Sequence, residues 1–428
     1  MTPTSAIMNS VETLDYRVTV GDVATKAGLE INLARQQLLA LAADTGGNLQ
    51  VTETGEIVYL FPRNFRGILR NKHWQLQWQQ SWQKVWRVLF YLIRISFGIA
   101  LILSVLLMFV AIAVIVIGLS VSGNNEENSD RRDNSGGGVL FLPRFWFSPD
   151  FFGVFSWNRG YSPQSNPEKK INFLESIFSF LFGDGNPNSR LEEHRWQEIG
   201  TVIRNQKGAI VAQQIAPYLD NIADFEEEDY ILPVLARFNG YPQVSDTGEI
   251  IYYFPDLQVT ATEKQAESVS PYLKEKTWQF SQAGSGQIIG AIALGCLNFI
   301  LALVLGYLLQ GDLATQLGEF VTFVASIYWV LWGYGVSFLT IPLVRYFWLQ
   351  GRNNKIRQRN QNRETVATML SQASDSLGQK IAYARRFAAQ KVIGDEDITY
   401  STEQDLLDQN LQRADQIDQD WLNRLESQ

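Results

Sequence analysis

The chain is poor in the side chains that bind transition metals. Its 428 residues include one cysteine, Cys296, and two histidines, His73 and His194. A single thiol excludes an internal disulfide. Structural zinc sites use four Cys or His ligands, and iron–sulfur clusters are held mainly by four cysteines. Three such side chains fall short of either set, so the sequence predicts no metal site and no cofactor within one chain.

Signatures of catalysis are also missing. The sequence contains no GxxxxGK[ST] phosphate loop, no GxSxG nucleophile elbow and no HExxH zinc motif. The glycines at 136–138 lie in a polar stretch, and Gly183 and Gly185 follow no strand that would make them a dinucleotide-binding loop. We therefore predict that the protein is not an enzyme.

Charged residues are absent from three long hydrophobic stretches, at 95–122, 286–310 and 320–344. A helix needs about 20 such residues to cross a bilayer, so each stretch is long enough. Without Asp or Glu in these stretches, a carboxylate proton relay or ion pathway along them is excluded. The sequence therefore predicts an integral membrane protein with an all-α transmembrane region.

The distribution of Lys and Arg conflicts with three simple crossings. Basic residues cluster before the first stretch and after the third, and Lys274 and Lys276 precede the second. Because basic loops face the cytoplasm, both termini and the segment before the second stretch are predicted to be cytoplasmic. The chain must then return across the membrane between Ser122 and Ser189.

Two ways of returning are left open. The apolar residues of segment 85–122 either cross once or fold back as a tight hairpin. Alternatively, segment 123–189, predicted as a Gly-rich linker followed by aromatic membrane-interface segments at 139–157 and 171–182, contains a re-entrant element.

Four tryptophans recur at every fourth residue in segment 66–84 and just beyond it: Trp74, Trp78, Trp82 and Trp86. At 100° per residue they lie on one face of a helix, and Gln and Lys occupy much of the rest. A Trp stripe opposed by a polar face is typical of a helix in the headgroup layer, so membrane lipid is one predicted partner. The alternative is a helix that packs this stripe against protein.

Two soluble segments read almost alike. Residues 51–62 are VTETGEIVYLFP and residues 244–255 are VSDTGEIIYYFP, with eight of twelve positions identical. Helical spacing, then two strands around Thr54 and Gly55, predicts the order of a winged-helix domain in each copy. The fold class is therefore mixed: two winged-helix-like (α+β) domains, at 15–63 and 190–258, joined to the transmembrane region.

The last two strands of each copy form the predicted wing, whose matched residues alternate along the chain. Side chains of a strand alternate between its two faces, so the matched apolar residues share one face. We interpret this face as the core side, and the alternative is a shared ligand surface. The matched wing residues are Gly55, Glu56, Ile57, Tyr59, Phe61, Gly248, Glu249, Ile250, Tyr252 and Phe254.

The charge of the copies opposes nucleic-acid binding. Residues 11–63 hold seven acidic and four basic residues, and residues 190–257 hold twelve and five. The predicted third helices carry only Arg35 or Arg237 as bases, which offers few phosphate contacts. Acidic docking modules for a protein partner fit this charge better. The last segment, 345–428, is predicted as a charged helical tail.

Three further segments, YLIRISFG at 91–98, NFLESIFSFLFGDG at 172–185 and YSTEQDLL at 400–407, resemble a family of largely uncharacterised integral membrane proteins of cyanobacteria and chloroplasts. The resemblance implies a membrane protein, and plant members carry a label tied to iron–sulfur cluster biosynthesis. One cysteine within a membrane span cannot hold a cluster, and the family supplies no site residues to carry over.

These observations lead to one main hypothesis and two alternatives. The main hypothesis is a non-enzymatic membrane scaffold, or an assembly or maintenance factor, whose cytoplasmic modules dock a protein partner. The alternatives are a membrane-tethered transcription regulator and a small channel or transporter.

Overall fold

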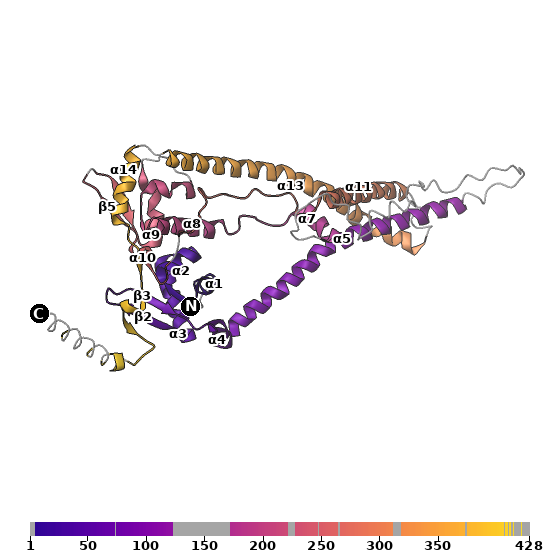
Figure 1. Cartoon of the computed structure of the whole chain (residues 1–428). Coiled ribbons are helices and arrows are strands. Elements are labelled where there is room, and N and C mark those ends of the chain that lie inside the picture. Colours follow the sequence, from indigo (N-terminus) through magenta and orange to yellow (C-terminus); the bar gives the residue numbers. More distant parts are fainter. Residues whose placement is uncertain are drawn as a thin grey trace, which may run out of the picture. The chain divides into compact units, whose positions relative to one another are not determined.

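The computed structural model divides into two units, which are described separately (Figure 1). Unit 1 comprises Met1–Gln80, Pro187–Lys276 and Lys355–Gln428, and unit 2 comprises Ser81–Asn186 and Thr277–Asn354. The fold is mixed and mostly helical, with small sheets. The structure describes residues 5–72, 74–122, 172–220, 227–246, 248–263, 266–310, 318–372, 375–405, 407–409, 411, 414 and 421.

The first repeat, copy 1, contains three helices and a three-stranded antiparallel sheet in the order β1-β3-β2. The sequence predicted that this copy starts at residue 15, but it begins earlier, with a helix whose residues Ile7 and Val11 are fully buried. Its elements are α1 (Ser5–Thr13), β1 (Arg17–Thr19), α2 (Val20–Ala27), α3 (Ile31–Thr45), β2 (Asn48–Thr52) and β3 (Ile57–Leu60).

Local sequence explains the boundaries of copy 1. Thr19 and Asp22 form a capping box at the start of α2, because each side chain accepts a hydrogen bond from the other residue's amide. Gly28 ends α2 with a φ of 65°, and Gly46 ends α3 with a φ of 68°. Only glycine adopts this left-handed conformation without strain, so these positions stop the helices.

The second repeat, copy 2, has the same element order and the equivalent strand order, β4-β6-β5. In the place of α2, copy 2 has two short 3-10 turns, because Pro217 has no amide hydrogen to continue an α-helix. The elements are α8 (Leu191–Asn205), β4 (Ala209–Ile210), η2 (Ala212–Gln214), η3 (Ala216–Tyr218), η4 (Glu228–Ile231), α9 (Leu232–Phe238), β5 (Tyr241–Val244) and β6 (Ile250–Tyr253).

The two copies share one hydrophobic core within unit 1. Helix α2 of copy 1 packs on α8 of copy 2, where Gly200 leaves room for Thr25 (Figure 1). Buried residues of both copies, among them Leu38, Tyr59 and Phe254, belong to a single cluster. Because one continuous core cannot be split by a bilayer, both copies lie on the same side of any membrane.

The rest of unit 1 is built from the segments that follow copy 2 and the C-terminal region. The tail predicted as helical at 345–428 is helical as far as α14, but after α14 the chain forms short strands, and β9 adds to the sheet of copy 1. These elements are α10 (Pro255–Gln258), β7 (Val259–Thr260), α14 (Asp375–Ala384), η5 (Arg385–Phe387), β8 (Lys391–Val392), η6 (Asp395–Asp397) and β9 (Ile398–Ser401).

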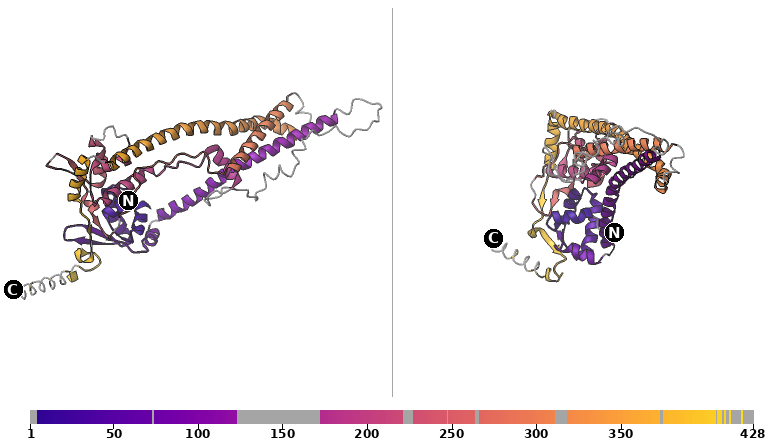
Figure 2. Two further views of the ribbon diagram at one scale, coloured as in Figure 1. Left: turned by 45° about the horizontal axis from the view of Figure 1, so that its top comes forward. Right: turned by 90° about the vertical axis from the view of Figure 1, so that its right-hand side faces the viewer.

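Within the described ranges, three helices are long and apolar enough to cross a membrane (Figure 2). The apolar segment Val85–Leu119 lies in one continuous helix, which excludes the tight hairpin expected as one alternative there. The predicted helix at 66–84 falls on two helices, α4 and the start of α5. The helices of this region are α4 (Phe65–Lys72), α5 (Trp74–Ser122), α7 (Phe173–Phe182), α11 (Ser285–Leu308) and α13 (Glu319–Ser371).

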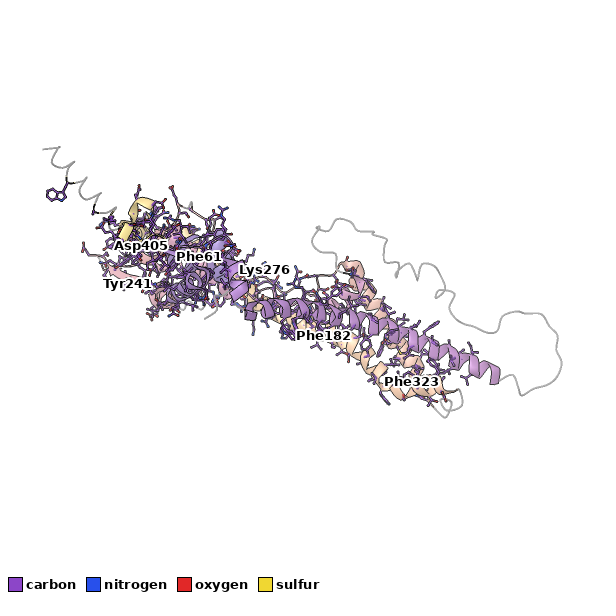
Figure 3. The ribbon with its side chains drawn as sticks, turned by 90° about the horizontal axis from the view of Figure 1, so that it is seen from below. Phe61, Phe182, Tyr241, Lys276, Phe323 and Asp405 are labelled. Atoms are coloured by element: carbon purple, nitrogen blue, oxygen red, sulfur yellow. The ribbon has the colours of Figure 1, made fainter. Side chains whose placement is uncertain are left out.

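Helix α7 is too short to cross and lies beside the first half of the apolar part of α5. Leu174 of α7 packs against Gly98, and the ring of Phe182 lies 5.0 Å from that of Phe97. In Figure 3, Phe182 and Phe323 of α13 lie at different levels along the bundle. Helix α7 therefore lies at the level of Gly98 of α5. Residues 123–171, where the sequence analysis placed the return, lie outside the described residues.

A polar cluster holds α7 in unit 2. Asp184 forms an ion pair with Arg94 of α5 at 2.5 Å and accepts hydrogen bonds from Ser179 and from the Gln282 amide. Arg345 of α13 donates to the Ser179 and Phe180 carbonyls. The turn after α7 thus joins three segments that are far apart in the chain.

Candidate functional site

The matched residues of the two hairpins, β2–β3 and β5–β6, lie mainly in the shared core. Tyr59, Phe61, Tyr252 and Phe254 are buried there. Ile57 is partly buried against the same core, whereas its counterpart Ile250 is 37% exposed. The two hairpins therefore differ at their tips.

Each hairpin turn contains a glycine followed by a glutamate. Gly55 and Gly248 have φ angles of 88° and 84°, which favour glycine at both turns. Burial alone would raise the pKa of Glu56, but hydrogen bonds from the Thr52 and Thr54 hydroxyls and the charge of Lys391 lower it to about 2. The Glu249 carboxylate lies 3.8 Å from the Lys380 ammonium group.

The second face of each hairpin is covered by the rest of unit 1. Val58 of copy 1 is fully buried against Ala261 and Ile393. Ile251 of copy 2 is fully buried against Ala384 of α14. A shared ligand surface on the hairpins would need one open face, and both faces are occupied along most of their length.

The outer strands of the two hairpins differ in whether another strand pairs with them. In copy 1, β9 pairs antiparallel with β2, with Tyr400 opposite Val51. In copy 2, no strand of the described chain pairs with the outer side of β5, and all four residues of β5 are exposed. At the tip of the copy 2 hairpin, Val244 is 56% exposed and lies opposite Ile250.

Two features limit main-chain pairing along β5. The Ser245 amide donates to the Glu249 carbonyl at 2.8 Å. Because such bonds recur at every second residue of an antiparallel ladder, the main-chain groups of Pro242 and Val244 face away from β6. Pro242 has no N–H to offer, and the Tyr383 hydroxyl lies 3.4 Å from the Val244 carbonyl as a donor.

Part of the acidic excess of the copies, and of the segment after copy 2, is matched by basic residues of the C-terminal region. Glu228, whose side chain is 12% exposed, pairs with Lys380 of α14, whose side chain is 8% exposed. Glu275 pairs with Arg359 at 2.6 Å and with Arg363 at 3.0 Å. Residue counts could not show this pairing, because the acids and bases lie in separate stretches of sequence.

The ion pairs also affect titration. Burial by itself would raise the pKa of Asp220 and of Glu275. For both carboxylates the effect of Arg363 and of a second arginine outweighs burial, and the pKa is lowered. The second arginine is Arg195 for Asp220 and Arg359 for Glu275. These carboxylates stay charged and bound to the chain's own bases.

The arginines of the third helices make internal contacts. Arg237 of α9 donates to the Gly28 carbonyl at 2.6 Å and stacks over the Trp196 ring at 4.4 Å. Arg35 of α3 lies 3.5 Å from Asp256. Both guanidinium groups therefore already have a partner within the chain, which leaves them less available to phosphate.

The tryptophan stripe lies on α5. The side chains of Trp82 and Trp86 are exposed, and those of Trp74 and Trp78 lie outside the described residues. In unit 2 the Arg352 guanidinium lies 4.7 Å and 5.1 Å from the rings of Trp278 and Trp348. Spacing revealed the stripe, but nothing in the sequence pointed to this second aromatic group.

Among the described residues, no three His, Cys, Asp or Glu side chains come together as a group that could hold a metal ion. Cys296 is exposed on α11.

Comparisons with known proteins identify a relative. A protein of Arabidopsis thaliana, named only as an uncharacterized chloroplastic protein, is 37% identical over 421 residues, which cover 94% of this chain and 79% of that protein. The chain belongs to the family of this chloroplast protein. No family model and no solved structure matches the chain. The relative and the three long apolar helices are compatible with a membrane protein.

Proposed function

We propose that the protein is a non-enzymatic scaffold, anchored in a membrane, that docks a protein partner through copy 2. The element order of each copy, with its strand orders β1-β3-β2 and β4-β6-β5, supports two winged-helix-like modules. Winged helices serve as protein docking modules as well as nucleic-acid readers. Fused through one core, the two modules would present a rigid surface to the partner.

The open tip of the copy 2 hairpin carries this proposal. Val244 and Ile250 are apolar, exposed and opposite each other, whereas the equivalent Val51 and Ile57 are partly covered. Because Pro242 and Tyr383 limit main-chain pairing, side-chain contacts at the tip supply the docking energy. Apolar residues at the centre of an interface commonly provide most of its affinity.

The helices of unit 2 supply the anchor. The three long helices would cross a plasma or thylakoid membrane, and the exposed Trp82 and Trp86 would lie in the headgroup layer, where their rings are favoured. Basic residues at both ends of the membrane region favour a cytoplasmic position for the soluble modules. The chloroplastic relative favours the thylakoid among these membranes.

The label on plant members concerns iron–sulfur cluster biosynthesis. One exposed cysteine in α11 cannot hold a cluster. A role in such biosynthesis would therefore run through the docked partner. No second function is proposed: the third-helix arginines are engaged internally, which disfavours a transcription regulator, and the absence of carboxylates in the spans disfavours a proton- or ion-coupled transporter.

The test is crosslinking and co-purification of the tagged full-length chain from native membranes, followed by mass spectrometry. Replacing both tip residues, Val244→Asp with Ile250→Asp, should remove a partner that the unmodified chain retains, because each aspartate places a charge in an apolar contact. The matched control is Leu39→Asp, since Leu39 is an apolar residue of copy 1 that is similarly exposed.

The control should keep the partner. Retention of the same partners by the double variant would refute docking at the tip. Failure to recover a reproducible partner with the unmodified chain would refute the scaffold itself.

A further inference from the structure

A cleft of about 400 Å³ lies within unit 1, where the two copies meet. Its walls come from α2 of copy 1, α8 of copy 2, the segment after β7 and the C-terminal region. Clefts of roughly this size, about 300 to 1,000 Å³, are typical of small-molecule sites. Sequence inspection did not find it, because its residues come from four separate stretches.

A buried ion pair forms part of the wall. Arg204 of α8 places Nη2 2.7 Å from Asp22 Oδ1. Asp22 Oδ2 accepts hydrogen bonds from the Thr19 amide and hydroxyl and from the Ala261 amide. Arg204 Nε is buried and makes no hydrogen bond to a residue of the described chain. The guanidinium therefore retains a donor that its carboxylate partner does not use.

Two buried hydroxyl groups line the same cleft. Thr25 is 6% exposed and Thr260 is 4% exposed, and the Oγ1 atom of each lacks a hydrogen-bond partner among the described residues. A buried polar group without a partner costs about 1–3 kcal/mol, so native proteins rarely keep one without a reason. Three wall residues with unused donors in one cleft suit a ligand that supplies acceptor oxygens.

Several charged side chains that line the cleft are paired with each other. Lys26 lies 3.5 Å from Glu267, and His194 lies 3.2 Å from Glu198. Burial raises the pKa of Glu198, although His194 and the Ser270 amide act against this effect. Lys207 also lines the cleft and forms no ion pair with a described residue.

We propose that this cleft binds a small molecule through a carboxylate or phosphate group, with Arg204, Thr25 and Thr260 donating to its oxygens and Lys207 adding charge attraction. Arginine and hydroxyl donors are the groups that proteins use for both anions. The site is separate from the docking tip of copy 2, so its failure and the failure of the scaffold proposal are distinguishable.

The experiment measures thermal unfolding of the full-length chain in detergent as inorganic phosphate or citrate is added, with sodium chloride at the same ionic strength as reference. The test variant combines Thr25→Val with Thr260→Val, which keeps the shape of both side chains and removes the unpaired hydroxyls. The control is Thr45→Val, since Thr45 is also buried but donates to the Leu41 carbonyl and does not line the cleft.

At least one of the two anions should raise the unfolding temperature of the unmodified chain and of the control. In the double valine variant the apparent affinity should fall about tenfold or more, as expected when two hydrogen bonds are lost. Its unfolding temperature without anion should be unchanged or higher, which shows that it folds. An equal anion effect in all three chains would overturn the proposal. So would no effect of either anion, in which case the cleft holds water only.

Discussion

The two copies share one fold but present different surfaces. The outer strand of copy 1 is closed by β9, while the outer strand of copy 2 stays open and is limited by Pro242. Leu49, the counterpart of Pro242, donates its amide hydrogen to the Thr402 hydroxyl and accepts from the Thr402 amide. Unpaired strand edges invite association, and proline is one of the ways in which proteins control them. The strand edge of copy 1 is thus closed within the chain, and the strand edge of copy 2 stays open.

The contacts of the C-terminal region with the two copies also differ in burial. It contacts copy 2 through the buried pair of Lys380 and Glu228 and contacts copy 1 through the more exposed pair of Lys391 and Glu56, at 3.4 Å. Buried pairs are costly to break, whereas exposed pairs contribute little. The C-terminal region should therefore be held mainly by copy 2, with β9 pairing as its attachment to copy 1.

The largest expected difference concerns the position before the residue that ends each third helix. Phe238 of copy 2 is fully buried against Trp196, and Thr45 is its counterpart in copy 1. Phe238→Ala should lower the free energy of unfolding by about 3–5 kcal/mol. Thr45→Ala should lower it by about 1 kcal/mol, because one methyl group and one hydrogen bond are lost. Scanning fluorimetry in detergent measures both losses of stability. Equal losses would contradict a larger contribution of Phe238 than of Thr45 to the shared core.

The two ion pairs of the C-terminal region should differ next. Lys380→Met leaves the Glu228 carboxylate buried without its partner and should cost about 3 kcal/mol, whereas Lys391→Met should cost less than about 1 kcal/mol. Hydrogen exchange of residues 375–401 measures release of the region. Adding Glu228→Gln to Lys380→Met should restore most of the protection, because the uncompensated charge is gone. Equal effects of the two single variants would refute the assigned order.

Acid should weaken the attachment to copy 1. The pKa of Glu56 is about 2 in the folded chain and 4.5 ordinarily, so its stabilisation is complete above about pH 4.5 and is lost as the pH falls toward 2. The unfolding temperature of the unmodified chain should exceed that of Glu56→Gln at pH 5, by the equivalent of about 1 kcal/mol. The two should converge near pH 2. A difference that does not change with pH would show that ionisation of Glu56 plays no part.

The smallest expected change in stability tests the open edge. Pro242→Val gives β5 an outward amide hydrogen and should change the free energy of unfolding by less than about 1 kcal/mol. It should nevertheless increase self-association, seen by light scattering of the detergent-solubilised chain. Leu49→Pro in copy 1 is the matched change and should leave the chain monodisperse, because β9 still covers that edge. Association of both variants would indicate that β9 detaches readily.

Much of each copy followed from local sequence. The strands around Gly55 were predicted from the turn residues. The helix ends at Gly28, Gly46 and Asn239 also have a local cause, because left-handed positions favour glycine or asparagine. Helix α1 was missed, although Ile7 and Val11 lie four residues apart, because its mixed composition gives a weak signal. Strands β8 and β9 were missed because they are short and are stabilised only by pairing with distant parts of the chain.

The acidic composition of the copies did not show which acids are paired within the chain. Glu228 and Asp220 of copy 2, and Glu275 after it, pair with Lys380, Arg363 and Arg359. The hairpin tip and the cleft were not visible in the sequence either. Exposure and unused hydrogen-bond donors depend on which segments come together.

By itself, the sequence determined the duplication, the order of elements in most of each copy and the three long apolar helices, because periodicity and turn residues act over short distances. Tertiary structure alone decided that the copies share one core, that the C-terminal region closes the edge of copy 1 and pairs with several of the acids, and that copy 2 keeps an exposed tip. Each of these depends on contacts between residues more than a hundred positions apart, and no local pattern specifies which distant segments will meet.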